Sequence, residues 1–353
     1  MDKIHKYAPI AGVITATMAC NLYCRHCKFA ARKPLPFELK EHEIKRIIDS
    51  LVKMDVPAVV IGGGEPLLRK DIYNIIKYAS DNDRYIILAT NATLINKKVA
   101  ERLKDAGVDQ IGLSLDGASP EVHDAYRGVP GAFHLTTEGL HACQDAGLAI
   151  SIRSTVGDIN AKDILKIFDF ALEIGIEEFS LLQTFPEGRA KDNNISEYST
   201  RKEYLDIINN ILFKCDALGV EPLTRPMNRH TVFQLPAAKH RNDDRYAPWV
   251  KINRTYGEGC AAARHAIILP NGDVRICTSI QESIGNVREH DLEDLWYGST
   301  LVRDMHDRSM LKGKCGDCPD KYSCGGCRAR AFLYTGNYFE SDPGCPLVLN
   351  LKE

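Results

Sequence analysis

The sequence predicts an α/β protein, a partial (β/α)6 TIM-like barrel followed by a small C-terminal α+β domain. Two observations support this. Short apolar runs alternate with segments of helical periodicity over the first half of the chain, a pattern typical of a parallel sheet covered by helices. Ten of the twelve cysteines gather in two groups, three near the N-terminus and seven between Cys260 and Cys345. These groups indicate two specialised regions.

The barrel is predicted from its strands and helices in order. Strands are expected at residues 10–17, 58–61, 85–88, 110–115, 149–154 and 178–182, with helices at 41–54, 71–80, 97–105, 137–146 and 162–174. The strand segments are short and apolar, as expected of buried parallel strands. Gly107, Gly147 and Gly175 each end a helix before the next strand, where glycine is favoured. Six repeats instead of eight predict an open barrel, whose functional residues should follow the strand ends.

Charge and composition exclude several classes of protein. The 353 residues carry a net charge of −2, which offers no electrostatic basis for a nucleic-acid partner. No apolar run is long enough to cross a membrane, and the first residues do not resemble a signal peptide. We therefore expect a cytoplasmic protein without a membrane partner, whose cysteines bind metal. Cys143 and Cys215 lie apart in helix-like stretches and are expected to be ordinary buried thiols.

Cys20, Cys24 and Cys27 form a C-x3-C-x2-C triplet directly after the first predicted strand. A structural zinc site requires four protein ligands, whereas three cysteines can hold an iron–sulfur cluster and leave one iron open. Chance cysteines or half of a zinc site are the alternatives. The spacing resembles the signature of the radical S-adenosylmethionine (SAM) enzymes. This resemblance implies a [4Fe–4S] cluster that binds SAM and reductively cleaves it to a 5′-deoxyadenosyl radical, which abstracts hydrogen from substrate.

A second motif follows the second predicted strand, where Gly62-Gly63-Gly64-Glu65-Pro66 resembles the GGEP motif of the same family. Glycine permits close approach of the backbone to a ligand. The resemblance implies that Gly63, Gly64 and Glu65 bind the amino group of SAM. A glycine run alone is more often a turn, but one strand after the cysteine triplet it strengthens the resemblance.

The resemblance implies further SAM contacts at later strand ends. Ser114 and Asp116 would line the ribose and methionine end of SAM, although Asp116 also fits a simple turn. Arg153 would meet the SAM carboxylate or else face solvent. His26 occupies a position that the family usually fills with an aromatic residue against the adenine. The segment 123–128 recurs in this branch of the family, but its chemistry alone assigns it no role.

The seven remaining cysteines follow residue 259, at Cys260, Cys277, Cys315, Cys318, Cys324, Cys327 and Cys345. Zinc is the metal expected by default at two C-x2-C pairs, yet seven cysteine ligands divide poorly into zinc sites of four. Their order resembles the SPASM extension of radical SAM enzymes. Apolar residues on both sides of Asn271-Gly272 fit the small hairpin of that domain.

The SPASM resemblance implies one or two auxiliary [4Fe–4S] clusters and divides the cysteines between two sets. One cluster would be fully ligated by Cys315, Cys318, Cys324 and Cys345. The other would be held by Cys260, Cys277 and Cys327, with a fourth position open to substrate, water or a side chain such as His265. The last C-x2-C pair is one residue shorter than is usual for the domain. A purely structural extension is the alternative.

These motifs divide the chain into a radical SAM partial barrel (1–190), a bridging region (191–255) and a SPASM auxiliary-cluster domain (256–353). The β/α rhythm fades after residue 185. Polar segments at 187–192 and 225–245 form either a solvated face or a site for substrate carboxylates. The second of them carries Arg225, Arg229, His230, Lys239, His240 and Arg241.

The run 127–133 and the residues after Cys324 look like the SPASM enzymes of haem d1 and alternative haem biosynthesis, which modify side chains of a tetrapyrrole. The resemblance favours removal or remodelling of a tetrapyrrole acetate or carboxylate, with a reductant protein such as ferredoxin or flavodoxin. Against it, residues 186–190 read P-E-G-R-A where the family often has P-T-G-R-G. Alternatives are a maturase that crosslinks or epimerises a ribosomal peptide, a sugar or nucleoside modifier, and a zinc-stabilised scaffold without activity.

Overall fold

The computed structural model describes residues 7–195, 202–220, 230–237, 260, 262–345 and 348. Its N-terminal strands are β1 (Ala11–Thr17), β2 (Ala58–Gly63), β3 (Tyr85–Thr90), β4 (Gln110–Ser114), β5 (Ala149–Val156) and β6 (Glu178–Gln183). The helices that alternate with them are α1 (Glu41–Lys53), α2 (Ile72–Asp81), α3 (Lys97–Asp105), α4 (Pro120–Arg127), α5 (Ala132–Asp145) and α6 (Ile164–Glu173), with 3-10 turns η2 (Pro66–Leu68) and η3 (Ala161–Asp163). The predicted elements are confirmed to within a few residues, except that α4 and the first turns of α5 are absent from the prediction.

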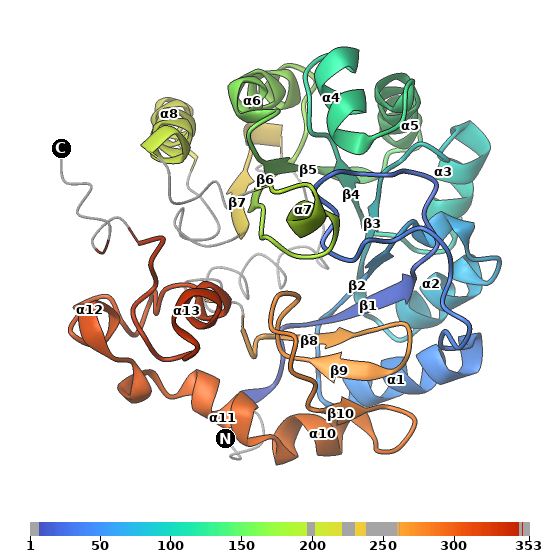
Figure 1. Cartoon of the computed structure of the whole chain (residues 1–353). Coiled ribbons are helices and arrows are strands. Elements are labelled where there is room, and N and C mark those ends of the chain that lie inside the picture. The colour runs from blue at the N-terminus through green and yellow to red at the C-terminus, as the bar shows by residue number, and fades with distance from the viewer. Residues whose placement is uncertain are drawn as a thin grey trace.

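The rest of the described chain adds shorter elements. Its strands are β7 (His230–Gln234), β8 (His265–Ile268), β9 (Asp273–Arg275) and β10 (Gly285–Asn286). Its helices are α7 (Arg189–Asp192), α8 (Lys202–Ala217), α10 (Leu292–Gly298), α11 (Thr300–His306), α12 (Gly313–Gly316) and α13 (Arg328–Thr335), with the 3-10 turn η5 (Arg308–Met310). Figure 1 shows α10–α13 gathered on the side of the molecule where β8–β10 lie.

Within the described residues, one ten-stranded sheet runs in the order β10-β9-β8-β1-β2-β3-β4-β5-β6-β7. Strands β1–β6 are parallel, and α1–α6 surround the outer side of their arc (Figure 1). The predicted partial α/β barrel is confirmed. The barrel alone does not test the resemblance to radical SAM enzymes, which depends on the residues of the site.

The two faces of the arc carry different cores. Ile44, Ile48 and Leu51 follow helical spacing on α1 and pack into the large core between helices and sheet. Side chains at alternate strand positions point the other way, and there Ala11 and Tyr85 belong to a separate small cluster. The inner face of the arc is therefore distinct from the helix-covered core.

Two strands from outside the β/α repeats close the edges of the arc, which the sequence does not predict. β7 pairs antiparallel with β6, and β8 pairs parallel with β1. An unpaired edge of an open sheet exposes backbone hydrogen-bonding groups, and these strands satisfy them. The predicted hairpin is confirmed, since β8 and β9 are antiparallel and Gly272 between them has a φ of +93°.

Other expectations meet the structure in part. Cys143 on α5 and Cys215 on α8 are buried, as predicted. None of the helices in the described ranges is long and apolar enough to cross a membrane. The cationic stretch is not tested, because Arg225, Arg229, Lys239, His240, Arg241 and the side chain of His230 lie outside the described residues.

Candidate functional site

The cysteine loop begins where β1 ends, so Cys20, Cys24 and Cys27 lie at the C-terminal edge of the parallel strands. Cys24 is buried, and the other two are partly exposed. Burial raises the pKa of the Cys20 thiol to about 11, and the charges of Cys24, Glu65 and Cys27 add to this rise. The three sulfurs therefore share one neighbourhood with Glu65.

The backbone of the cysteine loop is tied to the end of α4. Tyr23 N donates to Arg127 O at 3.1 Å, and Arg25 N donates to Tyr126 O at 2.9 Å. The two bonds flank Cys24 in the chain and fix the path of the loop there. The segment 123–128, which has no role by sequence alone, is thus part of the site.

Gly63 and Gly64 bring the glycine motif against the cysteine loop. Gly64 N donates to Thr17 O at 2.8 Å, and Glu65 N donates to Ala19 O at 2.7 Å. A Cβ atom on Gly64 would lie 2.1 Å from Ala19 O, and Gly63 has a φ of +137°, a conformation that favours glycine. The sequence predicts that these glycines approach a ligand, and the close approach that the structure shows is to the chain's own cysteine loop.

We expect Gly64→Ala to lower both the free energy of unfolding and the iron content of the reconstituted protein. The added methyl group would meet backbone atoms, and overpacking of this kind costs about 1–3 kcal/mol. Gly298→Ala is the matched control, because a Cβ atom there meets nothing within 4 Å. Urea unfolding and iron analysis measure the two effects. Equal values for the two variants would contradict the packing described.

Glu65 is fully buried and surrounded by hydrogen-bond donors. Its carboxylate accepts from the Thr90 hydroxyl at 2.8 Å, from Asn91 N at 2.9 Å and from Leu67 N at 3.1 Å. Burial raises the pKa of this carboxyl to about 7, against the effect of these bonds. Glu65 forms no ion pair with any residue that the structure describes, so its buried carboxyl group lies beside three thiols without a counter-ion there.

Asp116, buried beyond the end of β4, is held by the chain's own groups. Oδ1 accepts from Thr155 N at 2.7 Å, and Oδ2 lies 2.7 Å from Arg127 Nη2 and 3.5 Å from His26 Nε2. Asp116 N donates to His123 Nδ1 at 3.2 Å. Burial raises the pKa of Asp116, and the Arg127 charge opposes the rise. The structure thus adds a buried ion pair to the two roles that the sequence offers for this residue.

Arg127 connects Asp116 to Cys24. Its buried guanidinium pairs with Asp116 and donates from Nη1 to Cys24 Sγ at 3.7 Å. His26 stacks on Tyr126 with ring centroids 4.1 Å apart. Burial and the charge of Arg127 lower the pKa of His26 well below its usual value, so the ring is neutral. Arg127 and Tyr126 are absent from the predicted site, because the sequence shows only that segment 123–128 recurs in this branch of the family and assigns its residues no role.

Arg189, the first residue of α7, also holds the cysteine loop. Nε donates to Cys24 O at 2.9 Å, Nη1 donates to Ala31 O at 3.0 Å, and Arg189 N donates to Cys27 O at 2.9 Å. The guanidinium lies over the Tyr23 ring, 4.3 Å from its centroid. The expectation that the cations of segment 187–192 face solvent or bind substrate is wrong for Arg189, because its side chain is buried and occupied by loop carbonyls.

Ser114 and Arg153 are register partners on β4 and β5. Ile152 belongs to the helix-facing core, so Arg153, one residue later, points to the inner face of the arc. Its guanidinium covers Gly112. Burial lowers the pKa of Arg153, and the charge of Glu178 on β6 opposes this. Arg153 is partly buried on this inner face, and its contact with the SAM carboxylate stays a prediction.

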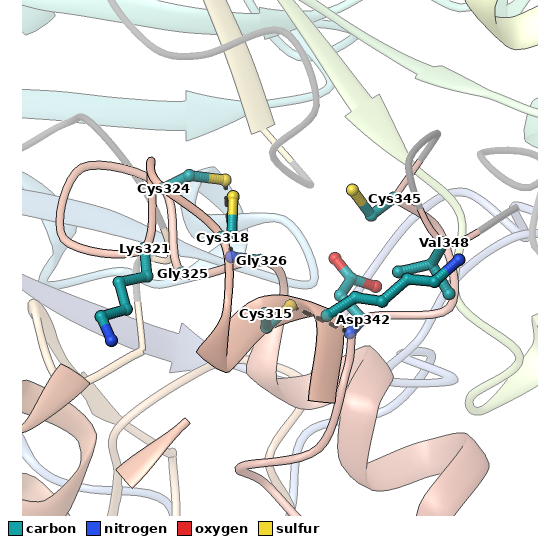
Figure 2. Close-up of a pocket in the computed structure, with 10 residues that line it drawn as sticks. Cys315, Cys318, Lys321, Cys324, Gly325, Gly326, Asp342, Cys345 and Val348 are labelled. Carbon is teal, nitrogen blue, oxygen red and sulfur yellow. Dashed lines mark hydrogen bonds between the residues drawn. The ribbon is translucent and has the colours of Figure 1, made fainter. Parts of the chain in front are cut away.

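A cavity in the C-terminal part of the chain is surrounded by four cysteines, as Figure 2 shows; they are Cys315, Cys318, Cys324 and Cys345. This is the set that the resemblance assigns to one auxiliary cluster. In the described ranges, no group of three His, Cys, Asp or Glu residues is placed to hold a single metal ion. Four thiols around a cavity are instead the donor set of a [4Fe–4S] cluster.

The other cysteine set lies next to the first. Burial raises the pKa of the Cys327 thiol, and the charges of Cys260 and Cys277 contribute to the rise, so the three are close together. Cys260 N donates to Cys324 O at 3.1 Å, which joins the two sets. His265, the candidate fourth ligand, begins β8, where burial lowers its pKa to about 4 and leaves its ring neutral.

Two family models match the chain. The model of the radical SAM superfamily matches residues 14–171, and the model of the SPASM iron–sulfur cluster-binding domain matches residues 260–319. The first range contains the cysteine triplet and the glycine motif. The second begins at Cys260 and includes the hairpin of β8 and β9.

Known proteins are similar over nearly the whole chain. The AdoMet-dependent heme synthase of Methanosarcina barkeri is 32% identical in an alignment of 343 residues that covers 93% of this chain and 94% of that protein. The pre-heme d1 synthase of Dinoroseobacter shibae is 29% identical, over 94% of this chain and 85% of that protein. Among solved structures, Streptococcus suis SuiB bound to precursor peptide SuiA matches with a TM-score of 0.72 and 20% identity, over 96% of this chain and 76% of that chain. The SuiB match supports the fold alone.

Proposed function

The chain belongs to the radical SAM superfamily and carries a SPASM domain, and on this premise we propose that it removes or remodels an acetate or propionate side chain of a tetrapyrrole. It is an enzyme of a family that binds a [4Fe–4S] cluster and SAM, and its SPASM domain binds auxiliary iron–sulfur clusters. The similarity to the AdoMet-dependent heme synthase over nearly the full length of both proteins supports the tetrapyrrole substrate.

In this proposal, Cys20, Cys24 and Cys27 hold the SAM-binding cluster, and Glu65 accepts the ammonium group of SAM. The burial of Glu65 and its lack of an ion pair among the described residues support this role. When bound, the cluster and SAM supply hydrogen-atom abstraction from an unactivated carbon. The protein positions the substrate carbon and excludes competing reactions.

The remaining proposed contacts to SAM come from the inner face of the arc of strands and from the cysteine loop. Arg153 offers its guanidinium to the SAM carboxylate, and Ser114 lies beside it in register. Asp116 supports the site through Arg127. The neutral ring of His26 presents a flat surface for the adenine.

Glu65→Gln is expected to weaken SAM binding by about 10–100-fold, because a hydrogen bond to a charged group contributes roughly 1.5–3 kcal/mol. Glutamine preserves the size of the side chain and removes its charge. Equilibrium dialysis of SAM with the anaerobic, reconstituted protein measures the change. Glu43→Gln is the control, because Glu43 is a partly buried carboxylate that pairs with Arg288, and its SAM affinity should equal that of the native protein. Native affinity in Glu65→Gln would remove Glu65 from the SAM site.

A ribosomal peptide is the second candidate substrate; the fold shared with SuiB, whose structure is bound to a precursor peptide, is compatible with it but does not favour it. A sugar or nucleoside is a third, with no specific observation in its favour. In each case we propose a reductant protein such as ferredoxin or flavodoxin as electron donor.

An anaerobic turnover experiment separates these substrates. The reconstituted, reduced protein is incubated with SAM and an iron tetrapyrrole that carries acetate and propionate groups, and mass spectrometry follows both compounds. We expect 5′-deoxyadenosine together with a loss of mass from the tetrapyrrole, and neither product from a Cys20→Ala/Cys24→Ala/Cys27→Ala variant. Formation of 5′-deoxyadenosine over an unchanged tetrapyrrole would contradict the proposed substrate and favour a peptide or sugar.

A further inference from the structure

Arg328 is a buried cation whose partners are unusual. It begins α13 directly after Cys327, and its side chain is almost fully buried. Nη1 donates to Tyr338 O at 2.8 Å and to Glu340 O at 2.7 Å, both uncharged carbonyls. Across the ranges that the structure describes, Arg328 forms no ion pair. A cation buried without a counter-ion is strongly unfavourable, so its burial requires a negative charge that no described carboxylate provides.

Asp342, a buried carboxylate of the same region, forms its ion pair with another arginine. Asp342 binds Arg330, which lies two residues after Arg328 on the same helix, through Nε–Oδ1 at 2.5 Å and Nη2–Oδ2 at 2.9 Å. Asp342 also accepts from Cys327 N at 2.6 Å. Both arginines are almost fully buried, but among the residues that the structure describes only Arg330 of the two forms an ion pair.

The remaining contacts of Arg328 are with ligand sulfurs. Its Nη2 donates to Cys315 Sγ at 3.5 Å, and its backbone N donates to Cys260 Sγ at 3.4 Å. Cys315 and Cys260 belong to different proposed ligand sets. Arg328 thus touches both sets, and it directs its positive charge only toward the set that surrounds the cavity in Figure 2.

We propose that Arg328 is a positioning residue for the auxiliary cluster at Cys315, where its guanidinium compensates the negative charge of the cluster and raises its reduction potential. This inference rests on the proposed ligand sets and is independent of the substrate. Net charge and hydrogen bonds to the sulfurs set the potentials of iron–sulfur clusters. A cation that water cannot screen stabilises the reduced form, which carries one more negative charge than the oxidised form.

Potentiometric titration of the holoenzyme, followed by electron paramagnetic resonance without tetrapyrrole, measures this effect. The signal of the SAM-binding cluster is identified by its change when SAM is added. In Arg328→Met we expect the ratio of reduced to oxidised auxiliary cluster at a fixed potential to fall by about tenfold or more, a shift of about 59 mV for one electron. Arg328→Lys keeps the charge and should retain most of the native potential.

Lys321→Met is the matched control, because Lys321 lines the same cavity but is partly exposed and binds Gly316 O. Solvent screening should limit its effect to less than about twofold. A native potential in Arg328→Met overturns the proposal, and so does an equal shift in Arg328→Met and Arg328→Lys.

If a variant loses the cluster, its potential cannot be measured, and iron analysis then decides the proposal. If Arg328→Met lacks the cluster and Arg328→Lys retains it, charge compensation is supported. If both variants lack it, the side chain acts through its shape and the proposal fails. If the native protein holds no cluster at Cys315, the ligand assignment and this inference fail together, while the tetrapyrrole proposal is still decided by the turnover experiment.

Discussion

Asp116→Ala is expected to lower the free energy of unfolding by about 3–5 kcal/mol, because it leaves a buried cation without its partner. Arg127 Nη2 lies 2.7 Å from Asp116, and the two side chains are buried. The substitution also removes the acceptor of Thr155 N. Since Arg127 further contacts Cys24 and its backbone carbonyl binds the cysteine loop, the variant should also retain less iron at the SAM site.

Urea unfolding and iron analysis test this expectation against a surface ion pair. Asp81→Ala breaks the exposed pair of Asp81 with Lys77 and should change stability by no more than about 0.5 kcal/mol. The double variant Asp116→Leu/Arg127→Met removes both charges and should be more stable than Asp116→Ala alone. If Asp116→Ala is as stable as Asp81→Ala, the buried pair does not support the loop.

Asp342→Ala is expected to have an effect of similar size, about 3–5 kcal/mol, because it removes the carboxylate of the buried ion pair between Asp342 and Arg330. Asp342 also accepts from Cys327 N and from Gly344 N. Arg330 in turn donates to Gln183 Oε1 on β6 at 2.9 Å. The substitution should therefore loosen the attachment of α13 to the barrel as well as the region around Cys327.

Urea unfolding measures the loss of stability, and hydrogen exchange of the Cys327 amide reports the local effect. Asp342→Asn retains hydrogen-bonding capacity without charge and should fall between Asp342→Ala and the native protein. Glu340→Ala is the control, because only the backbone carbonyl of Glu340 binds Arg328, and its amide protection at Cys327 should stay native. Native protection in Asp342→Ala would show that the buried network does not hold this segment.

The sequence predicts the barrel well because its signal is local. Apolar strand segments, helical periodicity and glycines at helix ends each act over a few residues, and β1–β6 follow them. The pairing of β8 with β1 joins residues about 250 positions apart, and no local pattern carries such a contact. The hairpin of β8 and β9 is predictable because a short turn with Gly272 joins its strands.

The residues of the candidate site also divide into those that a local pattern predicts and those that only long-range contacts bring there. The cysteines and Glu65 are found from short motifs with fixed spacing. Arg127 and Arg189 are not found, because their contacts to Cys24 span 103 and 165 residues. An arginine in a sequence is normally expected at the surface, and only the folded chain shows that these guanidinium groups are buried against the cysteine loop.

Transfer of a hydrogen isotope is the experiment we would perform first. An iron tetrapyrrole with deuterium on its acetate and propionate carbons is incubated anaerobically with the reduced protein and SAM, and the 5′-deoxyadenosine formed is analysed by mass spectrometry. We expect deuterium in the 5′-deoxyadenosine in parallel with the loss of mass from the tetrapyrrole. Unlabelled 5′-deoxyadenosine beside an unaltered tetrapyrrole would contradict hydrogen abstraction from these side chains.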